Sequence, residues 1–175
     1  MIITIAGKPG SGKTTVGKML AEKLKYKYYS CGSYMRELAA KKGMSLNMLI
    51  SKAEKDLSID KEIDGWQTQL GKKEDNFVLD SRLGFHFIPK SFKIFLDVDL
   101  DVSAERLYAA SHSGEHTLAE TKEIIQKRLD SEILRFTKEY NVNHLDFSHY
   151  NLVLVTSSLA PERIVQEISS KVQKK

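Results

Sequence analysis

Four short apolar segments, rich in β-branched residues, recur along the chain between stretches with helical spacing. They cover residues 2–6, 77–79, 92–98 and 152–155, and the tyrosine-rich residues 26–29 are a candidate for one more short strand. Segments with no polar face are typical of strands in a parallel sheet that helices cover on both sides. The pattern therefore predicts a three-layer α/β domain.

Apolar residues at helical spacing fill the intervals between these segments. The predicted helices cover residues 16–24, 33–71 (in pieces), 102–110, 118–140 and the stretch from about residue 161. Within the second interval we expect Ser33, Ser45 and Ser58 to be N-caps, because a side-chain oxygen there can accept a free backbone N–H. Proline and glycine are too scattered to mark a linker between domains.

Composition limits the size and the partners of the protein. A chain of 175 residues is expected to form one domain. With 27 basic and 23 acidic residues the net charge is only +4, so no stable nucleic-acid partner is expected. No apolar run approaches the roughly 20 residues that span a bilayer, and no signal-peptide pattern opens the chain. With Cys31 as its single cysteine, we expect a cytoplasmic monomer without an internal disulfide or a membrane partner.

A phosphate-binding motif follows the first predicted strand. The motif G-x-x-x-x-G-K-[ST] is matched in full by Gly7, Lys8, Pro9, Gly10, Ser11, Gly12, Lys13 and Thr14, with Thr15 next in the chain. Its glycines let successive N–H groups turn toward phosphate oxygens, and the following helix adds its N-terminal dipole. We expect Lys13 to reach the β- and γ-phosphates of ATP and Thr14 to bind Mg²⁺.

The motif leaves several classes of nucleotide-binding protein open. A GTPase needs an Asn-Lys-x-Asp segment that reads the base, and this sequence has none. Motor and transporter ATPases usually need a longer chain. Kinases of small acceptors remain as the leading class.

Two further segments narrow the class. Residues 29–37 carry Gly32-x₃-Arg36 after the second predicted strand, and residues 77–83 carry Asp80-x-Arg82-Leu83 at the end of the third. In these segments, and over nearly the whole chain, the sequence resembles the short, archaeal-type cytidylate kinases of the nucleoside monophosphate kinase superfamily. The resemblance implies ATP- and Mg²⁺-dependent phosphorylation of CMP or dCMP.

The resemblance also implies a single P-loop kinase domain whose parallel strands have the order 2-3-1-4-5. Its core comprises residues 1–30, 72–108 and 141–175. A helical monophosphate-binding arm covers residues about 31–71, and a small lid covers residues about 109–140.

Site residues follow from the same resemblance. Ser33, Arg36 and Arg82 are expected to hold the acceptor phosphate, while Asp80 orients a magnesium-bound water. Lys13, Arg82 and Arg128 are expected to supply catalytic charge, since arginine binds phosphate through a planar fork. Arg106 and Arg135 are candidates for the lid.

A purely structural interpretation of the lid helix remains open. Glu132 is spaced to pair with both Arg128 and Arg135, so a surface salt-bridge ladder would explain this stripe without catalysis. Residues 109–115 contain no basic residue, and we expect this segment to be mobile without ligand.

Some positions depart from the family pattern. Ser81 replaces a usual glycine, and Asn151 and Val155 stand where the family often has acidic residues. The same chemistry on AMP or another small acceptor therefore stays open, as does a slow nucleotide-binding switch for a protein or RNA partner.

Overall fold

The five predicted strands form one parallel sheet. A computed structural model describes residues 1–53, 56–111 and 116–173 of the chain. The strands are β1 (Ile2–Gly7), β2 (Lys27–Ser30), β3 (Phe77–Asp80), β4 (Phe92–Asp97) and β5 (Leu152–Val155). Their order is β2-β3-β1-β4-β5, as the resemblance implies.

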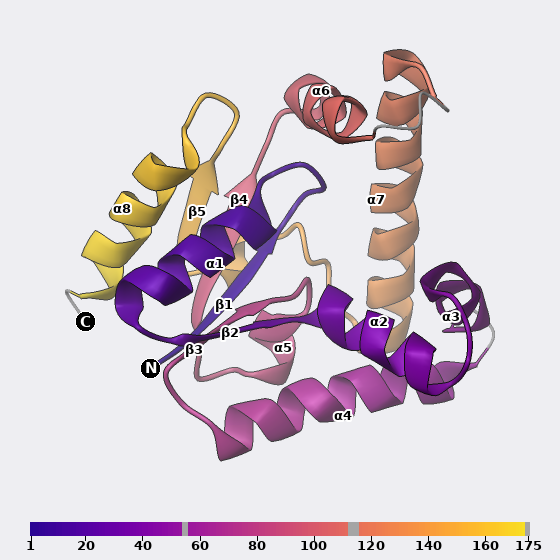
Figure 1. Ribbon diagram of the computed structural model, residues 1–175, viewed down its shortest axis with the longest axis horizontal. Coiled ribbons are helices and arrows are strands. Elements are labelled where there is room, and N and C mark those ends of the chain that lie inside the picture. Colours follow the sequence, from indigo (N-terminus) through magenta and orange to yellow (C-terminus); the bar gives the residue numbers. More distant parts are fainter. Residues whose placement is uncertain (54–55, 112–115, 174–175) are drawn as a thin grey trace.

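Helices connect the strands and cover the sheet (Figure 1). They are α1 (Lys13–Leu24), α2 (Cys31–Lys41), α3 (Leu46–Ala53), α4 (Leu57–Lys73), α5 (Gly84–Phe87), α6 (Leu100–Ala110), α7 (Leu118–Tyr140) and α8 (Pro161–Val172), with a 3₁₀ turn at Phe147–His149. Among the described residues, no helix is long and apolar enough to cross a membrane. Residues 112–115 of the segment expected to be mobile lie outside the described residues.

Apolar side chains fill the space on both faces of the sheet. On one face Leu20 of α1 and Ile168 of α8 pack against Ile5 and Ile94, and all four are fully buried. On the other face the buried side chains of α4 and of the segment around α5 pack against β3. The three predicted layers are therefore present.

The arm between β2 and β3 has a small apolar core of its own. Leu38 of α2, Leu49 of α3 and Ile63 of α4 form its centre. Two of its N-caps differ from the prediction, because the side chains of Ser30 and Asp56 accept the first free N–H groups of α2 and α4. Ser45 does accept from the N–H of Met48, as expected for a cap.

The strand register brings the candidate site residues to one edge of the sheet. Asp80, the last residue of β3, pairs with Ser30 on one side and with Ile5 on the other. Gly7 then leads from β1 into the phosphate loop at the same edge. Ligands of open α/β sheets bind outside the carboxyl ends of the strands, and this edge carries the chemistry described next.

Candidate active site

The phosphate loop depends on close backbone approach at its first glycine. Gly7 has φ of +151°, and a Cβ atom there would lie 2.2 Å from the carbonyl oxygen of Leu96. A side chain at this position would therefore separate β1 from β4. Gly12 caps α1 with a left-handed φ of 83°, so the loop turns directly into the helix N-terminus. Free N–H groups at a helix N-terminus favour a bound anion.

Lys13 is the first cation of the site. Its Nζ donates to the carbonyl oxygens of Gly7 and Lys8, each at 2.8 Å. Burial, together with the nearby Arg82 guanidinium, lowers the pKa of Lys13 to about 7, and Asp80 opposes this shift. Because burial disfavours the charged form of this amine, an anion bound beside it would stabilise that charge.

Asp80 and Thr14 face each other at the end of β3. Thr14 Oγ1 donates to Asp80 Oδ2 at 2.8 Å, and Tyr28 Oη donates to the same oxygen at 3.2 Å. Burial and the Asp80 carboxylate raise the pKa of Tyr28 to about 12, so the phenol keeps its proton.

This hydroxyl–carboxylate pair fits magnesium. Mg²⁺ prefers oxygen ligands and commonly completes its shell with water and substrate phosphates. Among the described residues, no group of three or more His, Cys, Asp or Glu side chains could hold a metal ion alone. The residues present therefore suit a magnesium ion that arrives with a nucleotide.

Glu132 brings two arginines together beside Lys13. Arg128 Nε donates to Glu132 Oε1 at 3.0 Å, and Arg82 Nε lies 2.6 Å from Glu132 Oε2. The Arg82 contact is an ion pair whose atoms do not meet in hydrogen-bond geometry within the described structure. Of the two ion pairs expected along α7, only the one between Glu132 and Arg128 is formed. The other oxygen of Glu132 pairs with Arg82 of the core and not with Arg135.

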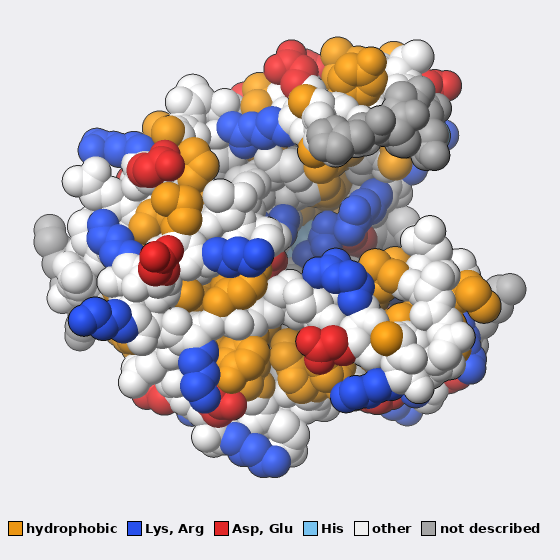
Figure 2. Space-filling view, viewed as in Figure 1, with side chains coloured by type: hydrophobic (Ala, Val, Ile, Leu, Met, Phe, Trp, Pro, Cys, Tyr) orange, Lys and Arg blue, Asp and Glu red, His pale blue; other side chains and the backbone are white. Residues whose placement is uncertain are grey.

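The surface of the protein is hollowed between two of its parts. Figure 2 shows a hollow between the α6–α7 part of the molecule and the α2–α3 part, with Lys and Arg side chains gathered along it. Burial lowers the pKa of Arg82, with the neighbouring Arg128 acting in the same direction and Glu132 opposing it. Lys13, Arg82 and Arg128 are thus grouped with two carboxylates, Asp80 and Glu132.

Arg135 lies toward the arm. Its guanidinium is 5.2 Å from the ring centre of Phe136, and its charge lowers the pKa of Asp60 and Asp64 against the effect of burial. Burial nevertheless raises the pKa of Asp64 to about 6, and Tyr140 Oη donates to Asp64 Oδ2 at 2.7 Å. Helix α7 therefore contacts α4 of the arm through the hydrogen bond between Tyr140 and Asp64.

The expected acceptor residues of α2 lie at its first turns. Arg36 is exposed, and its Nη2 donates to Ser33 Oγ at 3.2 Å. Ser33 and Arg36 thus share one face of α2, and the remaining donors of Arg36 stay available to a phosphate.

Arg106 differs from its expected place in a lid. It belongs to α6 and donates to carbonyl oxygens of the core, Gly10 O at 3.1 Å and Thr156 O at 2.7 Å. Ser103 of the same helix donates to Pro9 O at 2.8 Å. Helix α6 therefore supports the phosphate loop from behind, and Arg106 joins that loop to the turn after β5.

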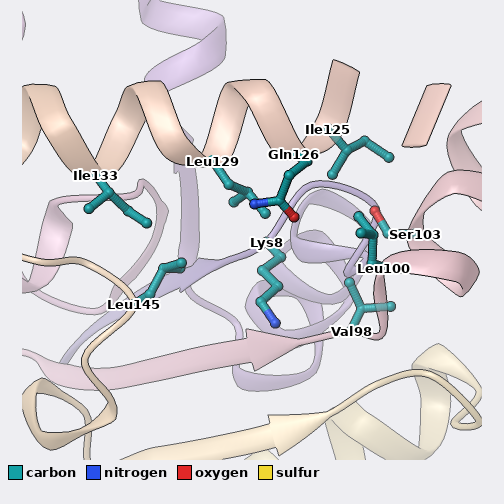
Figure 3. A pocket seen from close by; sticks show the side chains of 9 residues that line it. All are labelled: Lys8, Val98, Leu100, Ser103, Ile125, Gln126, Leu129, Ile133 and Leu145. Carbon is teal, nitrogen blue, oxygen red and sulfur yellow. The ribbon is translucent and has the colours of Figure 1, made fainter. Parts of the chain in front are cut away.

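A cavity of about 230 Å³ lies between α6, α7 and Lys8 of the phosphate loop (Figure 3). Leu129 and Gln126 of α7 face Lys8 across it. Lys8 Nζ is paired with Asp97 at 2.7 Å. Lys13 and Thr14 do not line this cavity, so it is separate from the face of the loop that is expected to bind phosphate.

Several contacts of the site were not found from the sequence. Tyr28 lies close to Asp80 because β2 and β3 are neighbours, and Gly17 leaves room for its ring. Gln67 accepts a hydrogen bond from Ser81 Oγ at 2.6 Å, which ties the arm to the end of β3. The sequence gives one signal for Tyr28, its place among alternating inward and outward positions of a short strand. That signal does not distinguish a site residue from a surface residue.

Comparison with known proteins identifies the family of this chain. A model described as the cytidylate kinase-like family matches residues 2–158. A cytidylate kinase of Methanobrevibacter smithii is 38% identical over 168 residues, 96% of this chain and 96% of that protein. The cytidylate kinase of Sulfolobus acidocaldarius is also 38% identical and covers 100% of this chain and 96% of its own length.

Solved structures support the fold. Shikimate kinase from Bacteroides thetaiotaomicron superposes with a TM-score of 0.76 over 99% of this chain and 98% of that chain, at 17% identity. At that identity the likeness concerns the arrangement of strands and helices alone. The family match over most of the sequence carries the assignment, and the chain belongs to the cytidylate kinase-like family.

Proposed function

We propose that this protein transfers the γ-phosphoryl group of ATP to CMP or dCMP, giving ADP and the nucleoside diphosphate. The observation that carries the proposal is the convergence of Lys13, Arg82 and Arg128 at the phosphate loop, next to Thr14 and Asp80. Phosphoryl transfer is catalysed mainly by positioning and by stabilising charge on the transferred group. The cytidylate kinases among the relatives support the choice of acceptor.

ATP is expected to lie along the phosphate loop. The backbone of Gly7, Lys8, Pro9, Gly10, Ser11 and Gly12 and the N-terminal residues Lys13, Thr14 and Thr15 of α1 form this part of the site. Lys13 exchanges its two carbonyl partners for oxygens of the β- and γ-phosphates, and a bound phosphate restores the ordinary charge of this amine.

Thr14 and Asp80 are proposed to hold magnesium, Thr14 directly and Asp80 through water. When bound, the ion neutralises charge on the β- and γ-phosphates. Tyr28 keeps the Asp80 carboxylate oriented through its hydrogen bond.

The acceptor is proposed to bind between α2 and the end of β3. Ser33, Arg36 and Arg82 hold its phosphate, and Arg128 faces the transferred group from α7. Arg135 is proposed to act from the arm side of the same helix. A monophosphate is already ionised at pH 7, so the reaction needs no strong general base, and the residues around Asp80 need only hold the two phosphates in line.

A panel of acceptors tests the proposal. The purified protein is given ATP and Mg²⁺ with CMP, dCMP, UMP, AMP, GMP or shikimate, and ADP is measured by a coupled assay. We expect CMP and dCMP to give at least tenfold more ADP per second than any other acceptor. Faster turnover with AMP or shikimate would reassign the acceptor, and ADP release that no acceptor stimulates would favour a switch module.

We also propose that the protein works as a monomer in the cytoplasm, without a stable nucleic-acid or membrane partner. Its substrates are small nucleotides, and a reducing compartment suits the free thiol of Cys31. Burial raises the pKa of that thiol to about 12, which makes it unreactive.

A further inference from the structure

Two arginines of the site form ion pairs with one carboxylate, each through its own Nε atom. Arg82 comes from the loop after β3 and Arg128 from the middle of α7, yet both form an ion pair with Glu132 through Nε, as a hydrogen bond for Arg128 and outside hydrogen-bond geometry for Arg82. The two contacts use different oxygens, Oε2 for Arg82 and Oε1 for Arg128, so each side of the carboxylate holds one guanidinium.

This mode of attachment leaves the phosphate-binding ends of both arginines available. A guanidinium binds phosphate in bidentate fashion through its fork of N–H donors. Within the described ranges, the ion pairs of Arg82 and Arg128 with Glu132 are formed through Nε, and no hydrogen bond uses an Nη atom of either arginine. Both forks are therefore available together, although the charge of Arg128 contributes to lowering the pKa of Arg82.

The carboxylate itself is fixed from behind. The Glu132 side chain is 13% exposed, and the ring of His144, which is 1% exposed, places Nε2 3.6 Å from Glu132 Oε2. Phe136 packs edge-on against that ring, with 5.1 Å between the ring centres. A carboxylate enclosed in this way has little freedom to leave the two arginines.

We propose that Glu132 is a positioning residue, which grips Arg82 and Arg128 by their Nε atoms so that both guanidinium forks face the transferred phosphate. Glu132 touches no substrate in this arrangement and acts only through the two arginines. The inference rests on the proposed function, since it assigns Arg82 and Arg128 to the phosphates. It predicts that losing the grip slows transfer while leaving ATP binding intact.

The test compares Glu132→Gln and Glu132→Asp with wild type, using initial rates with ATP and CMP. Gln keeps the reach and loses the charge, whereas Asp keeps the charge and loses the reach. Misplacing a catalytic group by about 1 Å can cost on the order of 100-fold in rate. We expect kcat to fall 10- to 100-fold in both variants. The KM for ATP should stay unchanged or fall in Glu132→Gln, because a negative charge near the phosphates is removed.

The matched control is Glu123→Gln. Glu123 lies on the same helix and is paired with Lys127 in an exposed i,i+4 contact, with 71% of its side chain exposed. We expect its kinetics to match wild type.

Arg128→Lys supplies a second readout. Lysine has a single ammonium group, so it cannot donate to Glu132 through one nitrogen and offer a separate pair of N–H donors to the phosphate. We expect this substitution to cost at least fivefold less in kcat when Glu132→Gln is already present than it does in wild type. Such non-additivity is expected of residues that act as one unit. If Glu132→Gln does not fold, the same comparison is made with Glu132→Asp.

The outcomes separate the inference from the proposed function. Equal costs of Arg128→Lys in both backgrounds, or a kcat within threefold of wild type in both Glu132 variants, would overturn the positioning role while CMP phosphorylation stands. A rise in the KM for ATP that matches the loss of rate would also overturn it, because it indicates a collapsed binding site. A wild-type protein that phosphorylates no monophosphate overturns both.

Discussion

Lys13 donates to two carbonyl oxygens of its own loop and is surrounded by the charges of Arg82, Arg128, Asp80 and Glu132. Replacing it with alanine removes the cation expected at the β- and γ-phosphates but leaves the backbone N–H groups of the loop. Loss of one such charge contact costs several kcal/mol of transition-state stabilisation, so we expect kcat of Lys13→Ala to fall at least about 1,000-fold.

The measurement is steady-state turnover with ATP and CMP, with circular dichroism to verify folding. Lys18→Ala is the control, since Lys18 is exposed on the same helix. Near-normal turnover of a folded Lys13→Ala protein would contradict the site.

Arg36 is proposed to hold the acceptor phosphate. Arg36→Lys keeps the charge but replaces a planar fork with a single ammonium group. We therefore expect the KM for CMP to rise about tenfold or more and the KM for ATP to change less than twofold. Initial rates over a grid of both substrates give the two values, and equal rises would remove Arg36 from the acceptor site.

Helix α7 carries Arg128, which we propose to face the transferred phosphate. Its Ile125 and Leu129 pack with Ala104 of α6, and its Phe136 packs with Leu83 and Phe85 of the core. The first turns are less well covered, as Leu118 and Ile124 are 44% and 45% exposed.

Hydrogen exchange of α7 should therefore differ along its length. We expect exchange around Phe136 to be slow with or without ligand, because that end is anchored in the core. Exchange from about residue 116 to Arg128 should slow at least fivefold with a bisubstrate analogue and much less with ADP alone. Equal exchange in all three states would show a helix that does not respond to the substrates.

Elements whose apolar pattern extends over many residues were predictable from the sequence. Most of the strands are continuously apolar and the long helices carry periodic apolar patterns, and the helical patterns extend over enough residues to outweigh local exceptions. The turn of α5 has four residues and the 3₁₀ turn at Phe147–His149 has three, so neither carries a pattern of its own. Ser33 was a poor choice of cap because α2 begins directly where β2 ends, which gives the capping position to Ser30.

The same distinction applies to the candidate site. The phosphate loop is a contiguous motif, so its geometry follows from local spacing. The Tyr28–Asp80 contact joins residues 52 apart in the chain. The ion pair of Arg82 with Glu132 joins a loop after β3 to α7. Partners of this kind are set by strand order and helix packing, and no spacing rule within one segment predicts them.

The stability of the whole molecule should depend on pH through His144. Burial lowers the pKa of His144 to about 4, from the ordinary value of 6.5, although Glu132 opposes the shift. The unfolded chain therefore binds more protons between these two pH values, so stability falls as the pH drops below about 6.5. Asp64 acts in the opposite direction, because burial raises its pKa to about 6 and the folded form then takes up the proton.

Comparing wild type with His144→Leu isolates the histidine. We expect wild type to lose about 2 kcal/mol more of its free energy of unfolding than the variant between pH 7.5 and pH 5. Urea unfolding at the two pH values measures the difference. Parallel losses in both proteins would mean that His144 is not buried in its neutral form.

Helix α7 touches both halves of the cleft, since Tyr140 near its end binds Asp64 of the arm and Arg128 lies beside the phosphate loop. The two substrates should consequently be thermodynamically linked, with ATP tightening CMP binding by the same factor as CMP tightens ATP binding. Calorimetry with a non-transferable ATP analogue measures this factor, which for linked sites is typically about 5 to 150. Tyr140→Phe, which removes the donor to Asp64, should bring it close to one while each substrate alone binds as before. If Tyr140→Phe leaves this factor unchanged, the two substrates are linked by another route. The effect of ATP on CMP binding must equal the effect of CMP on ATP binding whichever route links them.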